Sequence, residues 1–145
     1  MRLYPTVFLL LLTIGCARLP EMPKEMPKLT PCIVMVTLDG KPVEGVGVYF
    51  QPPVALNSDT VSWPSAGKTD AEGMTVMKTA AHYDGVVPGE YIVSLRKHAP
   101  EEFTADGMAL PAKSLLPDRY APGKSKEHVS VTTEKKEYVF ELKSE

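Results

Sequence analysis

The sequence predicts an all-β protein: a small antiparallel β-sandwich carried behind an N-terminal leader and a Pro-rich linker. Short apolar runs with alternating polar residues recur along the chain, and turn residues separate them. The 145-residue chain contains 14 prolines and 10 glycines, many of them at those turns. No convincing helical period lies between the runs, and the length allows one domain. A sandwich of about six strands is therefore the expected architecture.

The first two strands follow directly from residue type. Ile33–Leu38 is an apolar, β-branched run that predicts a strand. Asp39-Gly40 comes next, a dipeptide that favours a tight hairpin turn because both residues tolerate a positive φ. In the following run, alternation predicts a second strand with one buried face, formed by Val46, Val48 and Phe50.

The middle of the chain predicts a long loop, a turn and two further strands. A polar, proline-bounded loop is expected over about residues 51–67, followed by a turn over 68–73. The Asp70 carboxylate is expected to cap that turn by accepting backbone hydrogen bonds. Short strands are predicted over 74–77 and over 91–95, where apolar and polar residues alternate.

The C-terminal part predicts two strands joined by a charged turn. Val129–Thr132 forms the first, and Tyr138, Phe140 and Leu142 lie on one face of the second. The segment 100–126 shows no strand pattern, and a structureless loop of that length is uncommon in a compact domain. We therefore expect a short helix there, or an extended segment that lies across the sheet.

The N-terminus predicts export and lipid attachment. A positive residue precedes an apolar run over residues 7–14, which is too short to span a bilayer and is typical of a signal peptide. The run ends in Gly15-Cys16 and resembles a lipobox, with Thr13 standing where the usual pattern has Leu. The resemblance implies a signal peptide over 1–15 and a lipid group on Cys16. Ordinary secretion is the alternative.

A Pro-rich linker follows the anchored cysteine, and linker and cysteine together span residues 16–31. Ala17 lacks the aspartate type of inner-membrane retention signal, so resemblance to other lipoproteins implies an outer-membrane location. Prolines recur every few residues, at Pro20, Pro23, Pro27 and Pro31. Proline disfavours helix and strand alike, which predicts an extended, semi-rigid tether. The folded domain is then expected over 32–145.

The motifs of this domain resemble a known family. They are turn and strand-entry sequences in a fixed order, at 36–46 (VTLDGKPVEGV), 69–73 (TDAEG), 88–91 (PGEY), 116–120 (LPDRY), 129–131 and 138–142. Together they resemble the carboxypeptidase regulatory-like domain, in the version found in small planctomycete-type lipoproteins. The resemblance implies a transthyretin-like, or prealbumin-like, β-sandwich. It implies no active site, because no shared catalytic residues travel with that fold.

Charge and motif content point away from nucleic-acid binding and catalysis. A net charge of −2 gives no basic face for nucleic acid. The three histidines, His82, His98 and His128, stand at no metal-ligand spacing, and no Gly-x-Ser-x-Gly elbow or phosphate-binding Gly loop is present. We therefore expect no catalytic residue, no metal and no cofactor. A metal- or His-dependent enzyme that uses these histidines is the third hypothesis.

Two single residues carry further hypotheses. Trp63 is the only tryptophan and lies in the polar loop, where an exposed indole could stack on a sugar ring. The alternative is a Trp63 side chain packed over one end of the core. Cys32 stands at a strand start and predicts a half-buried, inert thiol when Cys16 is lipidated. A reactive Cys32 thiol stays an alternative, as does a Cys16–Cys32 disulfide in a chain without the lipid.

The sequence therefore favours a non-catalytic, lipid-anchored cell-envelope protein that presents a β-sandwich for interaction or structural roles. Its expected partners are the membrane, reached through the lipid, and an envelope protein or glycan. A carbohydrate-binding module that uses Trp63 is the second hypothesis.

Overall fold

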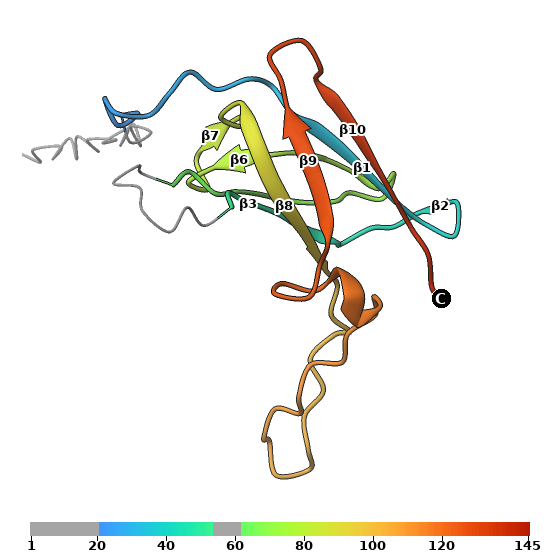
Figure 1. Ribbon diagram of the computed structural model, residues 1–145. Helices are drawn as coiled ribbons and strands as arrows, with labels where there is room; N and C mark the ends of the chain where they lie inside the picture. Colours follow the sequence, from blue (N-terminus) through green and yellow to red (C-terminus); the bar gives the residue numbers. More distant parts are fainter. Residues whose placement is uncertain (1–20, 54–61) are drawn as a thin grey trace, which may run out of the picture.

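The chain forms two β-sheets in a sandwich-like arrangement (Figure 1). A computed structural model describes residues 21–53 and 62–145. The predicted signal peptide and the predicted lipidation site Cys16 lie outside the described residues, as does the first part of the predicted tether. Within the two described ranges, no helix is long and apolar enough to cross a membrane.

One sheet contains the first and the last strand of the sandwich. Its members are β1 (Ile33–Leu38), β2 (Lys41–Pro42), β5 (Met74–Val76) and β10 (Glu137–Leu142). Strand β1 pairs antiparallel with both β5 and β2, but in parallel with β10 along its whole length, so the predicted antiparallel sandwich is wrong for this pair of strands. The β1–β10 pairing brings the two ends of the sandwich together (Figure 1).

The second sheet is antiparallel and has six strands. In spatial order they are β7 (Tyr83–Asp84), β6 (Lys78–Thr79), β4 (Ser65–Lys68), β3 (Gly47–Gln51), β8 (Gly89–Arg96) and β9 (Glu127–Val131). The chain crosses between the two sheets after β2, after β4, after β5 and after β9, so each sheet is assembled from segments that are distant in sequence.

The strands predicted from the sequence are confirmed, most of them with a buried face, but Met74 and Val76 of β5 are exposed. Val46, Val48 and Phe50 are completely buried, and the inward-facing residues of β8 are buried as well. The Asp39-Gly40 turn is also confirmed, since the two residues have φ values of 50° and 81°. It joins β1 to the two-residue β2, and the strand that follows lies in the other sheet.

The long loop expected over 51–67 is wrong at its C-terminal end, where β4 begins. Strand β4 reads Ser-Ala-Gly-Lys, and such residues are depleted or unremarkable in strands. It is extended because β3 and β6 pair with it on both sides. The two-residue strands β6 and β7 escaped prediction because they are too short to show a period of two.

The core lies between the sheets and contains aromatic contacts that join them. The Phe50 ring centroid lies 5.8 Å from that of Tyr91, which belongs to the same sheet. It lies 6.1 Å from the centroid of Phe140 in the opposite sheet, in an edge-to-face arrangement. Such pairs add to the stabilisation that burial of the rings provides.

Thr69 joins two places where the chain crosses between the sheets. One crossing leads from β2 to β3 and the other from β4 to β5. The buried Thr69 hydroxyl donates to the Val43 carbonyl (2.6 Å) and accepts from the Val46 amide (2.9 Å). The Thr69 backbone also bonds to Val46 (3.0 Å) and Gly45 (2.9 Å). We refer to these four hydrogen bonds as the Thr69 corner.

The turn after this corner is capped by Asp70, as the sequence predicts. Its Oδ1 atom accepts hydrogen bonds from the backbone amides of Glu72 (3.1 Å) and Met74 (2.8 Å). The carboxylate thereby supplies hydrogen-bond acceptors for two amides that have no backbone partner within the turn. This cap directs the chain into β5 in the opposite sheet.

Residues 99–115 form an arm that projects away from the sandwich (Figure 1). Its two sides bond to each other, with Ala99 N donating to Lys113 O (2.9 Å) and Leu110 N to Glu102 O (2.8 Å). The expectation of an extended segment lying across the sheet is therefore wrong, because the arm satisfies its own backbone groups. The alternative, a short helix, is present only as a 3₁₀ turn, η1 (Asp118–Tyr120), after the arm.

The end of the predicted tether packs against the sandwich. Thr30 and Val86 exchange two backbone hydrogen bonds of 2.9 Å each, and the Met26 side chain is buried. At Gly85 a Cβ atom would lie 2.6 Å from the Thr30 carbonyl oxygen, so the two chain segments touch closely. Packing of this linker on the six-stranded sheet thus begins before residue 32.

Replacement of Thr69 by valine tests the Thr69 corner. The shape is retained, but the Val43 carbonyl and the Val46 amide each lose a buried partner, so we expect a loss of about 2–4 kcal/mol in the free energy of unfolding. Urea denaturation measures the change. The control is Thr133→Val on the exposed β9–β10 turn, for which we expect about 0.5 kcal/mol or less. Equal effects of the two substitutions would contradict this role.

Candidate functional site

The outer face of the six-stranded sheet carries an open groove. Its central hollow has a volume of about 530 Å³ and is floored by small residues of β3 and β4. Its lining includes the Tyr49 ring, His98 and the cationic side chains of Lys68, Lys78 and Arg96. We call this surface the cationic groove.

The strand register explains why these side chains converge. Val48 points into the core, so its neighbours Gly47 and Tyr49 lie on the outer face of β3. Gly47 is opposite Lys68 of β4 on one side and opposite Arg96 of β8 on the other. The two cationic residues therefore flank a position that has no side chain of its own.

The absence of a side chain at Gly47 leaves room for the Tyr49 ring. A Cβ atom at Gly47 would lie 2.9 Å from Tyr49 Oη, closer than a real Cβ approaches, and 3.0 Å from a ring carbon, which is tighter than most real contacts. The ring thus lies over Gly47, between the strands that carry Lys68 and Arg96. Tyr49 is 38% exposed, which leaves the ring accessible from the groove.

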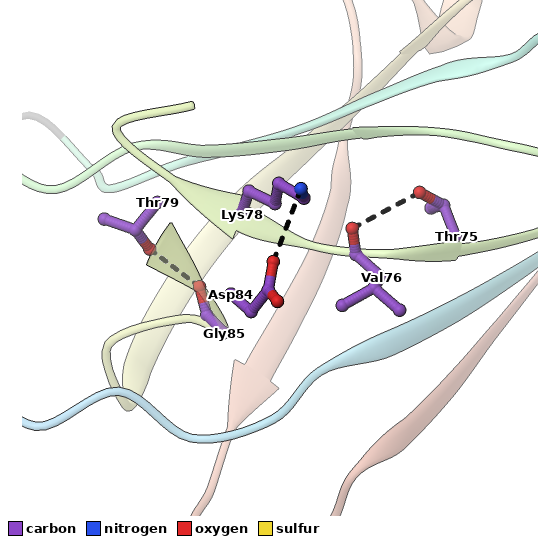
Figure 2. Close-up of polar contacts among 6 residues, drawn as sticks. All are labelled: Thr75, Val76, Lys78, Thr79, Asp84 and Gly85. Carbon is purple, nitrogen blue, oxygen red and sulfur yellow. Dashed lines mark hydrogen bonds and ion pairs between the residues drawn. The ribbon is translucent and has the colours of Figure 1, made fainter. Parts of the chain in front are cut away.

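Lys78 extends the charged lining to the next strand. It pairs with Ala66 in register, so it lies beside β4 on the same face of the sheet. Its Nζ atom lies 3.5 Å from Asp84 Oδ1, and Figure 2 shows the two side chains pointing toward each other from β6 and β7. Both side chains are at least half exposed, and an ion pair in that setting contributes about 0–1 kcal/mol.

The groove continues at both ends of its central hollow. A hollow of about 340 Å³ shares Tyr49 and Lys78 and extends to Pro64. At the other end, a hollow of about 530 Å³ shares Lys68 and His98 and reaches the base of the arm. One carboxylate lines that end, from Glu44, alongside a further cation from Lys97.

Trp63, the sequence-predicted ligand residue, lies next to this groove without lining it. It is half-buried, one residue before Pro64, which forms part of the wall. Residues 54–61, which lead into Ser62, are outside the described residues, and the packing of Trp63 over one end of the core stays a prediction.

The three histidines are not gathered into one site. His82 lies between β6 and β7, with its ring edge-to-face against Tyr83 at 6.3 Å. His98 lines the cationic groove, whereas His128 belongs to β9 and lines a separate hollow of about 350 Å³. In the parts of the chain that the structure describes, no three or more His, Cys, Asp or Glu residues are grouped to hold a metal ion.

Cys32 is more deeply buried than the sequence suggests. Its side chain is completely buried at the start of the core rather than half-buried, and its thiol is free. Burial raises the pKa of the Cys32 thiol from 9.0 to about 12, because the thiolate would lose its hydration. The thiol is consequently protonated and inert at neutral pH, and the alternative of a reactive thiol has no support in this geometry.

No known protein family, curated protein or solved structure matches this chain.

Thiol labelling tests the environment of Cys32. In a Cys16→Ser background Cys32 is the only cysteine, and a pKa near 12 in place of 9.0 leaves about 10³-fold less thiolate at pH 8. We expect Ellman's reagent to react quickly with the protein in urea and very slowly with the native protein. Rapid labelling of the native protein would contradict the described burial.

Proposed function

We propose that this protein is a non-catalytic, lipid-anchored cell-envelope protein whose β-sandwich is a binding module. The observation that supports binding is the cationic groove, where an accessible aromatic ring lies between cationic side chains on a rigid sheet. The strands fix the backbone positions of these residues, and the Tyr49 ring, packed over Gly47, has few rotamers to lose when a ligand binds.

The groove lining favours binding over chemistry. Its aliphatic hydroxyl side chains, Ser65 and Thr69, are buried and engaged in structural hydrogen bonds, Ser65 with Thr79 at 2.8 Å and Thr69 in its corner. Neither is paired with His98, the histidine of the groove, in the manner that nucleophilic catalysis requires. The proposal therefore assigns no catalytic residue, metal or cofactor.

The proposed location follows from the leader. The apolar run and Gly15-Cys16 support export and lipid attachment at Cys16, and the Pro-rich tether would then connect the lipid to the sandwich. We further propose that the sandwich is of the transthyretin-like, carboxypeptidase regulatory-like type. The two-sheet arrangement and the ordered turn motifs support that assignment.

A carbohydrate-binding module that uses Trp63 is the second candidate. Trp63 adjoins Pro64 at the end of the groove, so a sugar chain lying along the sheet could reach both Trp63 and Tyr49. This candidate differs from the first in the residue that carries the affinity.

Membrane fractionation tests the proposed anchor. Expressed in a bacterial host, the wild-type protein is expected in the membrane fraction, with an intact mass that begins at acylated Cys16. The Cys16→Ser protein keeps the same sandwich and is expected to be soluble. A soluble wild-type protein cleaved elsewhere would contradict the anchor and would support ordinary secretion.

Binding to isolated cell envelopes tests the proposed function and separates the two candidates. We expect the double variant Lys68→Gln/Arg96→Gln to lower the affinity of the purified protein for envelopes by about tenfold or more, since each substitution removes a charge-assisted contact. Trp63→Ala is expected to bind like wild type, within about twofold. Loss of binding in Trp63→Ala alone would favour the Trp63 module. Equal binding by all the variants would contradict the groove as the binding site.

A further inference from the structure

We propose that the cationic groove binds an anionic glycan, a sugar chain that carries carboxylate or phosphate groups. This inference rests on the proposed binding function and specifies the ligand of the same site. Lys68, Lys78 and Arg96 all line the central hollow of the groove. Their convergence is a local feature, because the chain as a whole has a net charge of −2.

The arrangement of the cations fits a chain better than a single small anion. Lys78, Lys68 and Arg96 belong to β6, β4 and β8, with β3 between the last two. At about 4.8 Å per strand, the backbone positions span about 14 Å across the sheet. Lys and Arg side chains are long enough to converge on one anion over that span, and what favours a chain is that the groove continues past both ends of its central hollow.

The Tyr49 ring favours a sugar chain over polyanions that have no apolar face. It lies over Gly47 between the strands that carry Lys68 and Arg96, and it is partly exposed. A flat apolar ring face pairs with the apolar face of a sugar, and the neighbouring cations are placed to bind the anionic substituents of the same unit. The groove thus presents both kinds of contact at one place.

Asp84 competes with the ligand for Lys78. Their 3.5 Å ion pair is exposed on both sides, so it is weak and can be replaced by an anionic group of the ligand (Figure 2). Asp84→Asn keeps the side-chain shape and removes the competing charge. The proposal therefore predicts a gain of affinity from this substitution, an effect that damage to the fold would not produce.

Titration calorimetry with defined oligosaccharides tests the ligand class on the full chain, purified from membranes in detergent. The probes are oligogalacturonate, which carries carboxylates, and a phosphomannan oligosaccharide, which carries phosphates. Fully methyl-esterified oligogalacturonate is the matched neutral control, and inorganic phosphate is the control for a simple anion. The two charged probes distinguish the source of the negative charge.

We expect at least one charged oligosaccharide to bind, with an affinity at least about tenfold above those of the neutral ester and of phosphate. Lys68→Gln and Tyr49→Ala should each weaken binding by about tenfold. Tyr49→Phe, which keeps the ring, and Lys136→Gln, a charge control on the β9–β10 turn, should stay within about twofold. Asp84→Asn should strengthen binding by about two- to fivefold.

Equal binding of the neutral ester would overturn the inference, as would equal binding of inorganic phosphate. Failure of both charged oligosaccharides to bind, while envelopes still bind in a Lys68-dependent manner, would overturn the ligand class and leave the proposed function intact. If every groove variant still bound envelopes as the wild type does, that result would instead contradict the proposed function itself.

Discussion

The Thr69 corner is the constraint on which the arrangement of the two sheets depends. Crossing from one sheet to the other removes backbone groups from their ladders, and two such crossings meet beside the core. The buried Thr69 hydroxyl donates a hydrogen bond to the β2–β3 crossing and accepts one from it, and the Thr69 backbone makes the other two hydrogen bonds of the corner. The crossings are thereby locked side by side, so β3 and β4 start and end at fixed positions.

The groove follows from that fixed geometry. Lys68 immediately precedes the corner, and Gly47 follows directly after Val46, which the corner binds. Gly47 pairs with Lys68 of β4 on one side and with Arg96 of β8 on the other, which places one cation on each side of the Tyr49 ring. The hydrogen bonds that hold the crossings therefore also align the strands that line the cationic groove, so the recognition that we propose depends on the same bonds as the fold.

Strong local signals made much of the sandwich predictable. Alternation indicated the strands around Phe50 and Tyr138, and the chemistry of Asp39-Gly40 and Asp70 indicated two turns. β4 was not predictable because its extended form depends on neighbouring strands rather than on its own residues. The groove was missed for the same reason: its residues are scattered in sequence, and only the pairing of β4, β3 and β8 brings them together. Trp63 drew attention as a single tryptophan, a signal of residue type that carries no information on position.

The central claim is that recognition takes place on the outer face of the six-stranded sheet. Hydrogen–deuterium exchange of the protein in the presence and absence of isolated cell envelopes locates the contact face most directly. The account predicts added protection in β3, β4 and β8, whose amides border the cationic groove, and unchanged exchange in β1 and β10 of the other sheet. Protection confined to the β1–β10 sheet, or to the arm over residues 99–115, would contradict it.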